Sequence, residues 1–331
     1  MRLLGTTEKD LAIASDAIAR GLLVAIPTET VYGLGADAFD PIAVARIFEA
    51  KRRPNFDPLI VHIARIGDAE RVAASIPAKA RALMDALWPG PLTLILPKRS
   101  EVPDIVTSGL ETVALRFPSH PVARRVIELS GTVVAAPSAN PFGYLSPTTA
   151  EHVASMLGDR IDFIVDGGPC EVGVESTVLD ACVDPPRVLR PGGMALDSIR
   201  RVIGDIDLFD RKVATPTSPG QLESHYAPHA ALYLFEYGSL PAAAKPGLID
   251  PVSSIALAFD RARGDALREC GLFEAVECLS ERGDAREAAA RLFSILHRLD
   301  AEGRTQIWAE KIPAEGLGAA VNDRLYKASR K

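Results

Sequence analysis

Hydroxyl, basic and imidazole side chains gather around two predicted strands near the N-terminus. The apolar segment 22–26 runs into a Pro-Thr-Glu-Thr turn that ends at Thr30, and the strand LIVHI carries His62. Between them a helical segment closes on a cationic cluster that includes Lys51 and Arg53. Side chains of these types bind polyanions, and phosphate is the obvious candidate. No GxxxxGK[ST] or GxGxxG string occurs in the sequence, so a phosphate site here would use side chains rather than a glycine cradle.

Further polar residues stand in or just after later predicted strands. They are Arg116, Ser138, Asn140, Ser176 and Arg190. Ligands collect at the carboxyl ends of strands in open α/β sheets, so we expect several of these loops to meet at one edge of a sheet. Arg116 lies among apolar residues in VALRF, where an unpaired charge is costly. Either a bound anion or an internal carboxylate would offset that cost.

The histidines and cysteines give weaker signals. His62 lies in a strand that reads as buried, so a satisfied core histidine and a substrate contact are equally open. His225 and His229 are four residues apart, but Pro228 breaks the helix that a zinc pair would need. We therefore expect no metal site built from the protein's own residues. The four cysteines show no CxxC spacing, which is typical of reduced thiols.

Composition limits the class of protein. The length of 331 residues favours two domains, and a content of 47% hydrophobic and 24% charged residues is ordinary for a soluble globular protein. A formal net charge of -6 argues against a broad nucleic-acid surface. Apolar runs are strand-sized, and the N-terminal segment reads as an amphipathic helix rather than a signal peptide. We expect a cytoplasmic protein with no membrane partner.

Residues 8–200 alternate between helical and extended patterns, which predicts an α/β domain with a twisted mixed sheet and flanking helices. Asp40 and Pro41 are the expected N-cap and first residue of one helix. The predicted helices are 8–20, 41–51, 77–87, 121–129 and 147–157. The predicted strands are 22–26, 59–63, 92–96, 113–117, 132–136, 162–166, 176–181 and 186–190.

The chain changes character after residue 200. Residues 201–230 are rich in proline and have no sustained periodicity, so they predict an extended linker. Residues 231–331 alternate strand and helix again, which predicts a smaller Rossmann-like α/β domain without a dinucleotide fingerprint. Its predicted strands are 231–235, 247–250, 254–259, 273–278 and 305–310, and its predicted helices are 261–269, 284–300 and 317–328.

An ordered series of motifs resembles the YrdC-like family. The motifs are PTETVYGLG, KxRP, PLIVHI, WPGPLTLIL, LRFPSHP, APSAN, GVESTVLD and LRPGG. The HYAPH segment and the ending GLGAAVNDRLYKA resemble the long two-domain members of that family. The resemblance implies synthesis of L-threonylcarbamoyladenylate from L-threonine, bicarbonate and ATP with Mg2+, releasing pyrophosphate. Its implied partners are the downstream enzymes that transfer the threonylcarbamoyl group to tRNA, with tRNA itself met only indirectly.

The resemblance also implies roles for individual residues. The catalytic group around the phosphates is Lys51, Arg53, Ser138 and Asn140. The ATP contacts are Arg53, Asp57, Thr112, Ser138, Asn140, Arg190 and Tyr226, the last from a linker that closes over the site as a lid. The threonine contacts are Thr30, His62, Arg116, Ser176 and the backbone of Ala136. No protein ligand to a metal is implied, because Mg2+ enters with ATP.

The chain departs from the family pattern at two places. Asp57 stands where the family usually carries Asn, and a carboxylate there would repel a triphosphate unless it helped to hold the metal. The linker reads SPGQLESHYAP, without the basic residues that many relatives carry before HYAP.

Two other functions compete with the synthase. The first is an RNA-binding module of the same fold without synthase activity, which the acidic net charge argues against. The second is a carbamoyl-transfer module of the kind found in hydrogenase-maturation proteins. Those chains carry additional zinc-finger-like and acylphosphatase-like parts that this sequence lacks.

Overall fold

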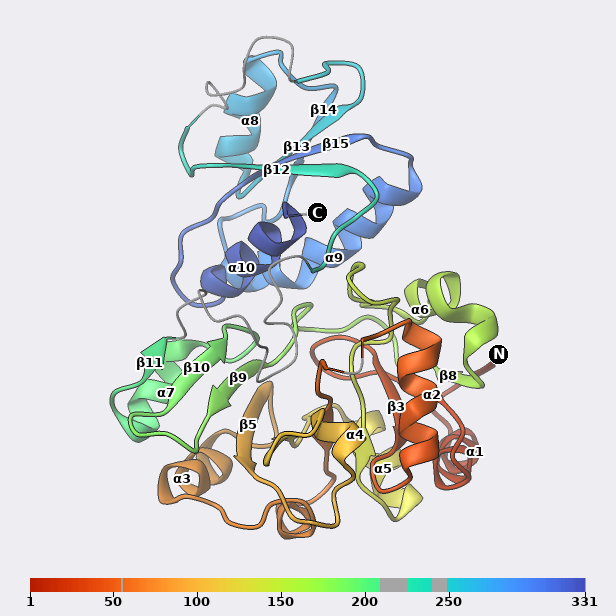
Figure 1. The fold of residues 1–331 in the computed structure, drawn as a ribbon. Helices are drawn as coiled ribbons and strands as arrows, with labels where there is room; N and C mark the ends of the chain where they lie inside the picture. Colours follow the sequence, from red (N-terminus) through yellow and green to blue (C-terminus); the bar gives the residue numbers. More distant parts are fainter. Residues whose placement is uncertain (55, 209–224, 240–248, 331) are drawn as a thin grey trace. The chain divides into compact units, whose positions relative to one another are not determined.

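The computed structural model describes residues 1–54, 56–208, 225–239 and 249–330, and the chain divides into two compact units (Figure 1). Unit 1 holds Met1–Phe142, Ser146–Glu171 and the chain from Glu175 to Gln221. Unit 2 holds the chain from Leu222 onward together with two short segments, Gly143–Leu145 and Val172–Val174. The predicted combination of a mixed α/β domain with a smaller α/β domain is confirmed. None of the described helices is long and apolar enough to cross a membrane.

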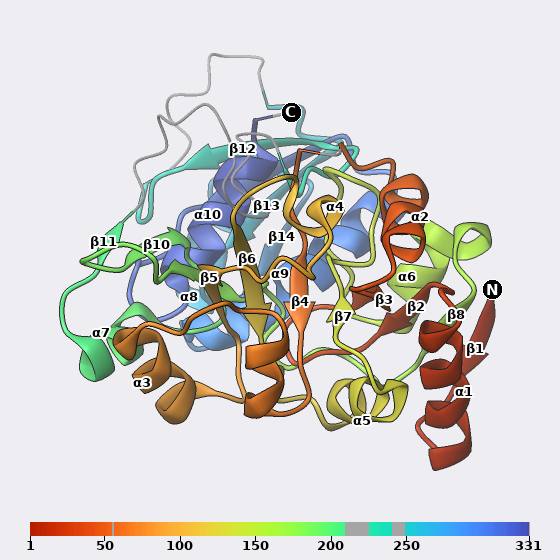
Figure 2. The same ribbon diagram turned by 60° about the horizontal axis from the view of Figure 1, so that its bottom comes forward.

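The described strands of unit 1 form one mixed sheet in the order β1-β8-β2-β3-β7-β4-β6-β5-β9-β10-β11. Strands β4 and β6 run parallel, whereas β7 and β5 run antiparallel to them (Figure 2). The strands are β1 (Arg2–Leu4), β2 (Val24–Ile26), β3 (Gly33–Asp37), β4 (Ile60–His62), β5 (Leu92–Pro97), β6 (Thr112–Arg116), β7 (Val134–Ala135), β8 (Phe163–Val165), β9 (Thr177–Asp180), β10 (Arg187–Arg190) and β11 (Asp207–Leu208).

The helices of unit 1 follow the sequence signals at their ends. The side chain of Asp40 accepts hydrogen bonds from the backbone N–H groups of Ile42 and Ala43, and Pro41 is the first helical residue, as predicted. The helices are α1 (Glu8–Ala19), α2 (Pro41–Lys51), α3 (Ala78–Leu87), α4 (Asp104–Thr107), α5 (Pro121–Ser130), α6 (Ala150–Leu157) and α7 (Leu196–Ile203), with 3-10 turns η1 (Ile66–Arg71) and η2 (Gly158–Arg160).

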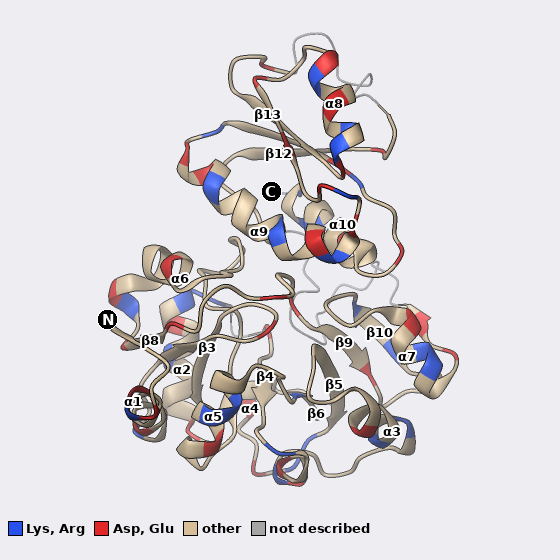
Figure 3. Ribbon diagram, turned by 180° about the vertical axis from the view of Figure 1, so that it is seen from behind, with Lys and Arg blue, Asp and Glu red and all other residues tan. Residues whose placement is uncertain are grey.

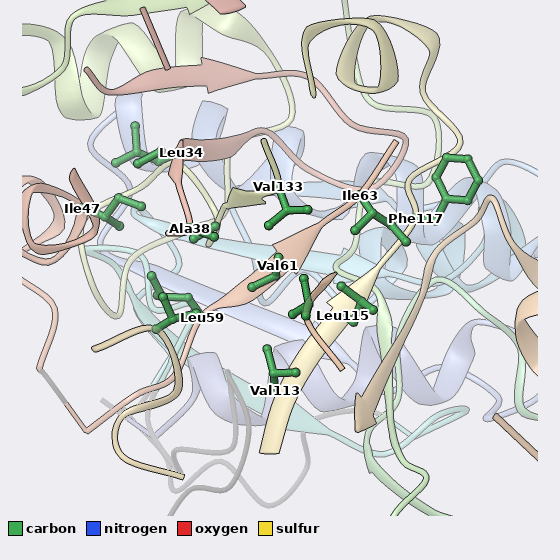
Figure 4. Packing of buried hydrophobic residues seen from close by; sticks show 14 of the residues in the cluster. Leu34, Ala38, Ile47, Leu59, Val61, Ile63, Val113, Leu115, Phe117 and Val133 are labelled. Carbon is green, nitrogen blue, oxygen red and sulfur yellow. The ribbon is translucent and has the colours of Figure 1, made fainter. Parts of the chain in front are cut away.

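The main core of unit 1 lies on one face of the sheet. Val61, Leu115 and Val133 point to this face and pack with Ile47 of helix α2 (Figure 4). Burying each such side chain contributes about 1.5–3 kcal/mol relative to leaving it exposed. Helices α1 and α5 form a second apolar cluster on the other face, over β2 and β7. Successive side chains in a strand alternate between faces, so β4, β6 and β5 turn a second set of residues away from the main core.

Strand β3 was not predicted, because its sequence GLGAD is poor in residues that favour strands. The structure shows why Gly35 is needed there. A Cβ on Gly35 would lie 3.0 Å from a methyl group of Val134 and 3.2 Å from the carbonyl oxygen of Val24. Close packing against both neighbouring strands therefore outweighs the low propensity. Helix α7 and strand β11 were also unexpected, and they place the first residues of the predicted linker in regular elements.

Unit 2 contains a parallel sheet in the order β12-β15-β13-β14, which fits the predicted Rossmann-like pattern. Helix α8 packs on β13 and β14, and helices α9 and α10 pack on each other. Of the predicted strand at 247–250, the described residues 249 and 250 form none. The elements are β12 (Ala231–Phe235), β13 (Ser254–Ala258), α8 (Arg261–Glu269), β14 (Ala275–Cys278), α9 (Ala285–Ala301), β15 (Gln306–Glu310) and α10 (Gly318–Ala328).

Candidate active site

A single row of opposed residues crosses five strands of unit 1 on the face turned away from the main core. We call this surface the polar face. His62 of β4 pairs with Arg116 of β6, and Arg116 pairs with Thr93 of β5. Thr93 then pairs with Val178 of β9, and Val178 with Arg190 of β10. Opposed residues on neighbouring strands lie about 5 Å apart, so the row brings imidazole, guanidinium and hydroxyl groups onto one face, interrupted only by the apolar side chain of Val178.

Arg190 joins this row because of a local irregularity. Val188 packs in the main core, and strict alternation would turn Arg190 to the same side. The register shifts between Val188 and Arg190, which brings Arg190 opposite Val178 instead. Such a bulge re-aims the side chain that follows it.

The prediction that the polar loops meet at one edge of the sheet is wrong. Strand β7 runs antiparallel to β4, whereas β6 runs parallel to it. Ser138 and Asn140 therefore follow the end of β7 at the edge opposite to the one where His62 and Arg116 end their strands. The strands are only a few residues long, so long side chains still approach one another across the face.

Lys51 is buried at the end of helix α2, and its Nζ donates hydrogen bonds to the backbone oxygens of Ser138 and Asn140, each at 2.5 Å. Burial, and then the neighbouring charge of Arg53, hold the pKa of Lys51 well below its usual range. Lys51 thus fixes the turn that carries two of the predicted phosphate ligands. Its predicted contact with phosphate stays a prediction.

Arg53 and Asp57 form a buried ion pair, with 2.8 Å between Nη2 and Oδ2. The guanidinium also donates to the backbone oxygens of Asp57 and Pro58. Burial raises the pKa of Asp57, and the charges of Arg53, Lys51 and Arg190 oppose that rise. The carboxylate of Asp57 thus lies among three basic side chains and offsets part of their charge.

Ser176 is held from two sides. Arg190 donates to its backbone oxygen from Nε at 3.2 Å and from Nη2 at 2.9 Å, and Nη2 lies 3.3 Å from its Oγ. The same Oγ shares a 2.7 Å hydrogen bond with Oγ1 of Thr93. Gly192 makes this approach possible, since a Cβ there would lie 2.3 Å from the backbone oxygen of Glu175.

The predicted threonine contacts Thr30, His62 and Arg116 are all buried. Oγ1 of Thr30 lies 2.9 Å from Oγ1 of Thr28. Burial, and then the charge of Arg116, lower the pKa of His62 to about 3, so its imidazole is neutral at physiological pH. Of the two ways to offset the charge of Arg116, the structure contains the internal carboxylate, because Glu29 lies 2.7 Å from its Nη2.

Three predicted contacts lie outside this polar cluster. Thr112 begins the strand that Arg116 ends, so about 13 Å of backbone separates them. Ala136 donates its N–H to Ile60 within the sheet and packs its methyl group in the apolar cluster under α1 and α5. Tyr226 belongs to unit 2.

Within unit 2 the ring of Tyr226 is buried between Phe293, at 5.7 Å between ring centroids, and the guanidinium of Arg324, 5.2 Å from the ring centre. Its backbone has a φ of 63°, an uncommon value for a residue other than glycine. The next residue, Ala227, donates its N–H to Gly143. The remaining residues of the predicted lid, 209–224, lie outside the described residues.

Sequence reasoning missed three polar residues of the site. Glu29 pairs with Arg116, Thr93 contacts Ser176, and Glu175 accepts a hydrogen bond from Ser146 while its charge acts on Lys51. Arg116 in an apolar strand signalled that some carboxylate could balance it, but nothing in the sequence singled out Glu29. Thr93 and Glu175 carried no comparable signal, because their partners come from distant parts of the chain.

Two family models match the chain. The one described as telomere recombination, which joins Sua5, YciO and YrdC proteins, matches residues 16–192. The one described as the C-terminal domain of threonylcarbamoyl-AMP synthase matches residues 194–330. Threonylcarbamoyl-AMP synthase from Pyrococcus abyssi is 44% identical over 97% of this chain and 94% of its own length. The Bacillus subtilis protein of the same name is 44% identical over 98% of this chain and 94% of its own.

A solved structure supports the same family assignment. The crystal structure of P. abyssi Sua5 complexed with L-threonine superimposes with a TM-score of 0.90 at 41% identity, over 99% of this chain and 98% of that one. The match extends across both units, each of which is also covered by its own family model. The chain therefore belongs to the threonylcarbamoyl-AMP synthase family of nucleotidyltransferases, in its two-domain form.

Proposed function

We propose that this chain makes L-threonylcarbamoyladenylate from L-threonine, bicarbonate and ATP and releases pyrophosphate, as the first step of threonylcarbamoyladenosine formation in tRNA. The row from His62 through Arg116 to Arg190 on the polar face carries this proposal. It sets an anion-binding guanidinium, hydroxyl groups and further cations side by side. The relative from P. abyssi, whose structure contains L-threonine, supports threonine as one substrate.

The reaction has two steps. After the ammonium group of threonine gives up one proton to solvent, its neutral amine attacks the carbon of bicarbonate, which gives the N-carboxylate and water. An oxygen of that carbamate then attacks the α-phosphorus of ATP in line, and pyrophosphate leaves. Arg116 binds the carboxylate of threonine, and the hydroxyls of Thr30 and Ser176 hydrogen-bond its polar groups. Neutral His62 can donate from one ring nitrogen and accept at the other.

Charge develops on the phosphate oxygens as pyrophosphate leaves. Lys51, Arg53 and Arg190 stabilise that charge together with the Mg2+ that accompanies ATP. Mg2+ usually keeps few protein ligands when it binds through substrate phosphates. Because the three side chains are already held by backbone oxygens, they need little reorganisation during the reaction. Positioning and electrostatics therefore dominate over acid–base catalysis.

The carbamate of threonine hydrolyses in water, which gives a chemical reason to close the site. We infer that the segment around Tyr226 closes over the substrates as a lid, with Tyr226 itself contacting ATP. The adenylate is then passed to the cytoplasmic enzymes that transfer the threonylcarbamoyl group to tRNA, so this chain meets tRNA only indirectly.

Pyrophosphate release tests the proposal. The full chain is incubated with MgATP, and L-threonine and bicarbonate are added separately and together. The proposal predicts release only when both are present. Release with neither would indicate plain ATP cleavage and contradict it.

No release in any mixture would favour the RNA-binding alternative, which a salt titration of tRNA binding then tests, since phosphate contacts give a steep salt dependence. The distribution of charge argues against that alternative. Basic and acidic residues occur together in helices such as α7, α8 and α10, where blue and red segments share one ribbon (Figure 3).

A further inference from the structure

We propose that Glu29 binds the α-ammonium group of the amino acid whose carboxylate Arg116 holds, so that the two residues together select a zwitterion. This inference rests on the proposed function, because it takes threonine to be the substrate at Arg116. Glu29 would then set specificity for the substrate as well as balance the charge of Arg116.

Arg116 and Glu29 form a buried ion pair. Nη2 of Arg116 lies 2.7 Å from Oε1 of Glu29, and the side chains keep only 4% and 5% of their surface exposed. Arg116 belongs to strand β6, in the row that crosses the polar face. Glu29 lies in the turn after β2, between the buried residues Thr28 and Thr30. The pair thus lies among the predicted threonine contacts rather than in the apolar core.

The contact is poorly aligned for a purely structural pair. Within the described part of the chain, Arg116 and the backbone N–H groups of Glu29 and Ser119 lie close enough to the carboxylate of Glu29 to lower its pKa, but none of these contacts has good hydrogen-bond geometry, and Nε and Nη2 of Arg116 have no well-aligned acceptor. Buried polar atoms are nearly always hydrogen-bonded in folded proteins, so such exceptions require an explanation. A ligand that supplies one donor group and one acceptor group would satisfy both partners.

A free amino acid is such a ligand. Its carboxylate offers acceptors to the guanidinium of Arg116, and its ammonium group offers three donors to the carboxylate of Glu29. Net charge in the pocket stays zero before and after binding, so the zwitterion does not leave a buried charge uncompensated. A carboxylic acid without the amine would place a second anion beside Glu29, which is costly in a buried site.

The other titratable groups around Glu29 supply no competing charge. Burial lowers the pKa of His62 to about 3 and also lowers the pKa of His120. Burial raises the pKa of Cys170 to about 12. All three are neutral near pH 7. Burial works to raise the pKa of Glu29, but the charge of Arg116 and the contacts from Arg116 and from the backbone of Glu29 and Ser119 together outweigh it, so the pKa is lowered and the carboxylate is ionised near pH 7.

The test compares two ligands by calorimetry on the full chain, at pH 7.5 and without ATP. The ligands are L-threonine and (R)-3-hydroxybutyrate, which keeps the carboxylate and the hydroxyl but lacks the ammonium group. We expect wild-type protein to prefer L-threonine by about tenfold or more, as a charge-assisted contact should give. In Glu29→Gln the preference should fall to about threefold or less, mainly through weaker binding of L-threonine.

Matched variants separate this role from a structural one. Glu29→Asp keeps the charge and should keep a preference for L-threonine. Glu128→Gln makes the same chemical change in an exposed ion pair with Arg65 and should leave the ratio of affinities unchanged. A Glu29→Gln protein that binds L-threonine and 3-hydroxybutyrate in the wild-type ratio would overturn the inference while leaving the proposed function intact. Wild-type protein that binds no L-threonine would overturn both.

A competition experiment on wild-type protein tests the same contact without depending on the folding of Glu29→Gln. L-threoninol keeps the ammonium group and the hydroxyl but has no carboxylate. Threoninol leaves Arg116 without a carboxylate, so it should compete with L-threonine only weakly, but its ammonium group should make it a better competitor than uncharged butane-1,3-diol. Competition by threoninol that is no stronger than that by butane-1,3-diol would contradict the inference.

Discussion

Arg53 and Asp57 form an ion pair in which neither side chain is appreciably exposed: 2.8 Å separates Nη2 from Oδ2, and the two side chains keep 4% and 0% of their surface. The pair lies in the cationic part of the proposed phosphate site. Asp57 therefore plays two opposing roles. It stabilises the guanidinium before ATP binds, and it offsets positive charge that would otherwise attract the phosphates.

Asp57→Asn should separate these roles. Removing the buried carboxylate should lower the free energy of unfolding of the ligand-free protein by about 1–3 kcal/mol, because Arg53 loses its charged partner. MgATP should then raise the melting temperature of the variant more than that of wild type, since the phosphates replace the missing charge.

Thermal unfolding with and without MgATP checks this prediction. Asp184→Asn removes an exposed ion pair with Lys79 and serves as the matched control. An ATP-dependent rise in melting temperature that is equal or smaller in Asp57→Asn would show that Asp57 does not oppose the binding of phosphate.

Gly192 should not tolerate a side chain. A Cβ there would lie 2.3 Å from the backbone oxygen of Glu175 and 2.4 Å from the backbone of Ser176. Gly192→Ala should therefore displace Ser176 and lower kcat/KM for pyrophosphate release by about tenfold or more. Gly67→Ala is the control, because nothing lies within 4 Å of its added methyl group. Equal activity of both variants would contradict the predicted role of this close approach.

His62 should make the protein less stable in acid. Its pKa is about 3 in the folded chain, below the ordinary value of 6.5. The unfolded chain therefore binds more protons between these values, and stability falls as pH decreases through this window, by about 1.4 kcal/mol per pH unit. Above pH 6.5 the contribution is constant.

Urea unfolding of wild type and His62→Gln at pH 7.5 and pH 5.0 measures this effect. The free energy of unfolding of wild type should fall by about 2 kcal/mol more than that of the variant between the two pH values. A parallel fall in both proteins would show that His62 is not held neutral by the fold.

Asp300 joins two separate segments within unit 2. It accepts hydrogen bonds from the hydroxyl of Tyr144 and from the backbone N–H groups of His229 and Ala230, and Nδ1 of His229 lies 2.7 Å from its Oδ2. Burial works to raise the pKa of Asp300, but the hydrogen bonds from Tyr144 and His229 outweigh it and lower that pKa. The carboxylate is thus the common anchor of both segments.

Asp300→Asn should lower the free energy of unfolding by about 1–3 kcal/mol, because an amide cannot accept all of these bonds. Tyr144 follows Asn140 closely in sequence, so pyrophosphate release should also fall. Asp265→Asn, in an exposed ion pair with Arg268, should change neither quantity. If Asp300→Asn had the stability and turnover of wild type, Asp300 would not anchor these two segments.

Local patterns predicted much of the fold. The signal Asp40-Pro41 marked the start of helix α2, and the apolar segment VALRF marked strand β6, which carries Arg116. These features depend on neighbours in the sequence, which periodicity and capping chemistry describe well. The resemblance to known motifs then assigned roles that local patterns alone left open.

What the sequence could not predict depends on pairing between distant segments. The antiparallel course of β7 separates Ser138 from the edge where Arg116 lies, and the bulge before Arg190 turns that side chain to the polar face. The sequence did not identify Glu29 as the partner of Arg116, because the two residues meet only when β2 and β6 are in one sheet. Register and strand order of this kind are set by the packing of the whole sheet.

The most direct test of the central claim follows carbon from bicarbonate into the product. Wild-type protein is incubated with MgATP, L-threonine and 13C-bicarbonate, and the adenylate is detected by mass spectrometry as pyrophosphate is measured. The account predicts L-threonylcarbamoyladenylate that is one mass unit heavier than with unlabelled bicarbonate, formed in equal amount to pyrophosphate. Pyrophosphate released without label in any adenylate would contradict it.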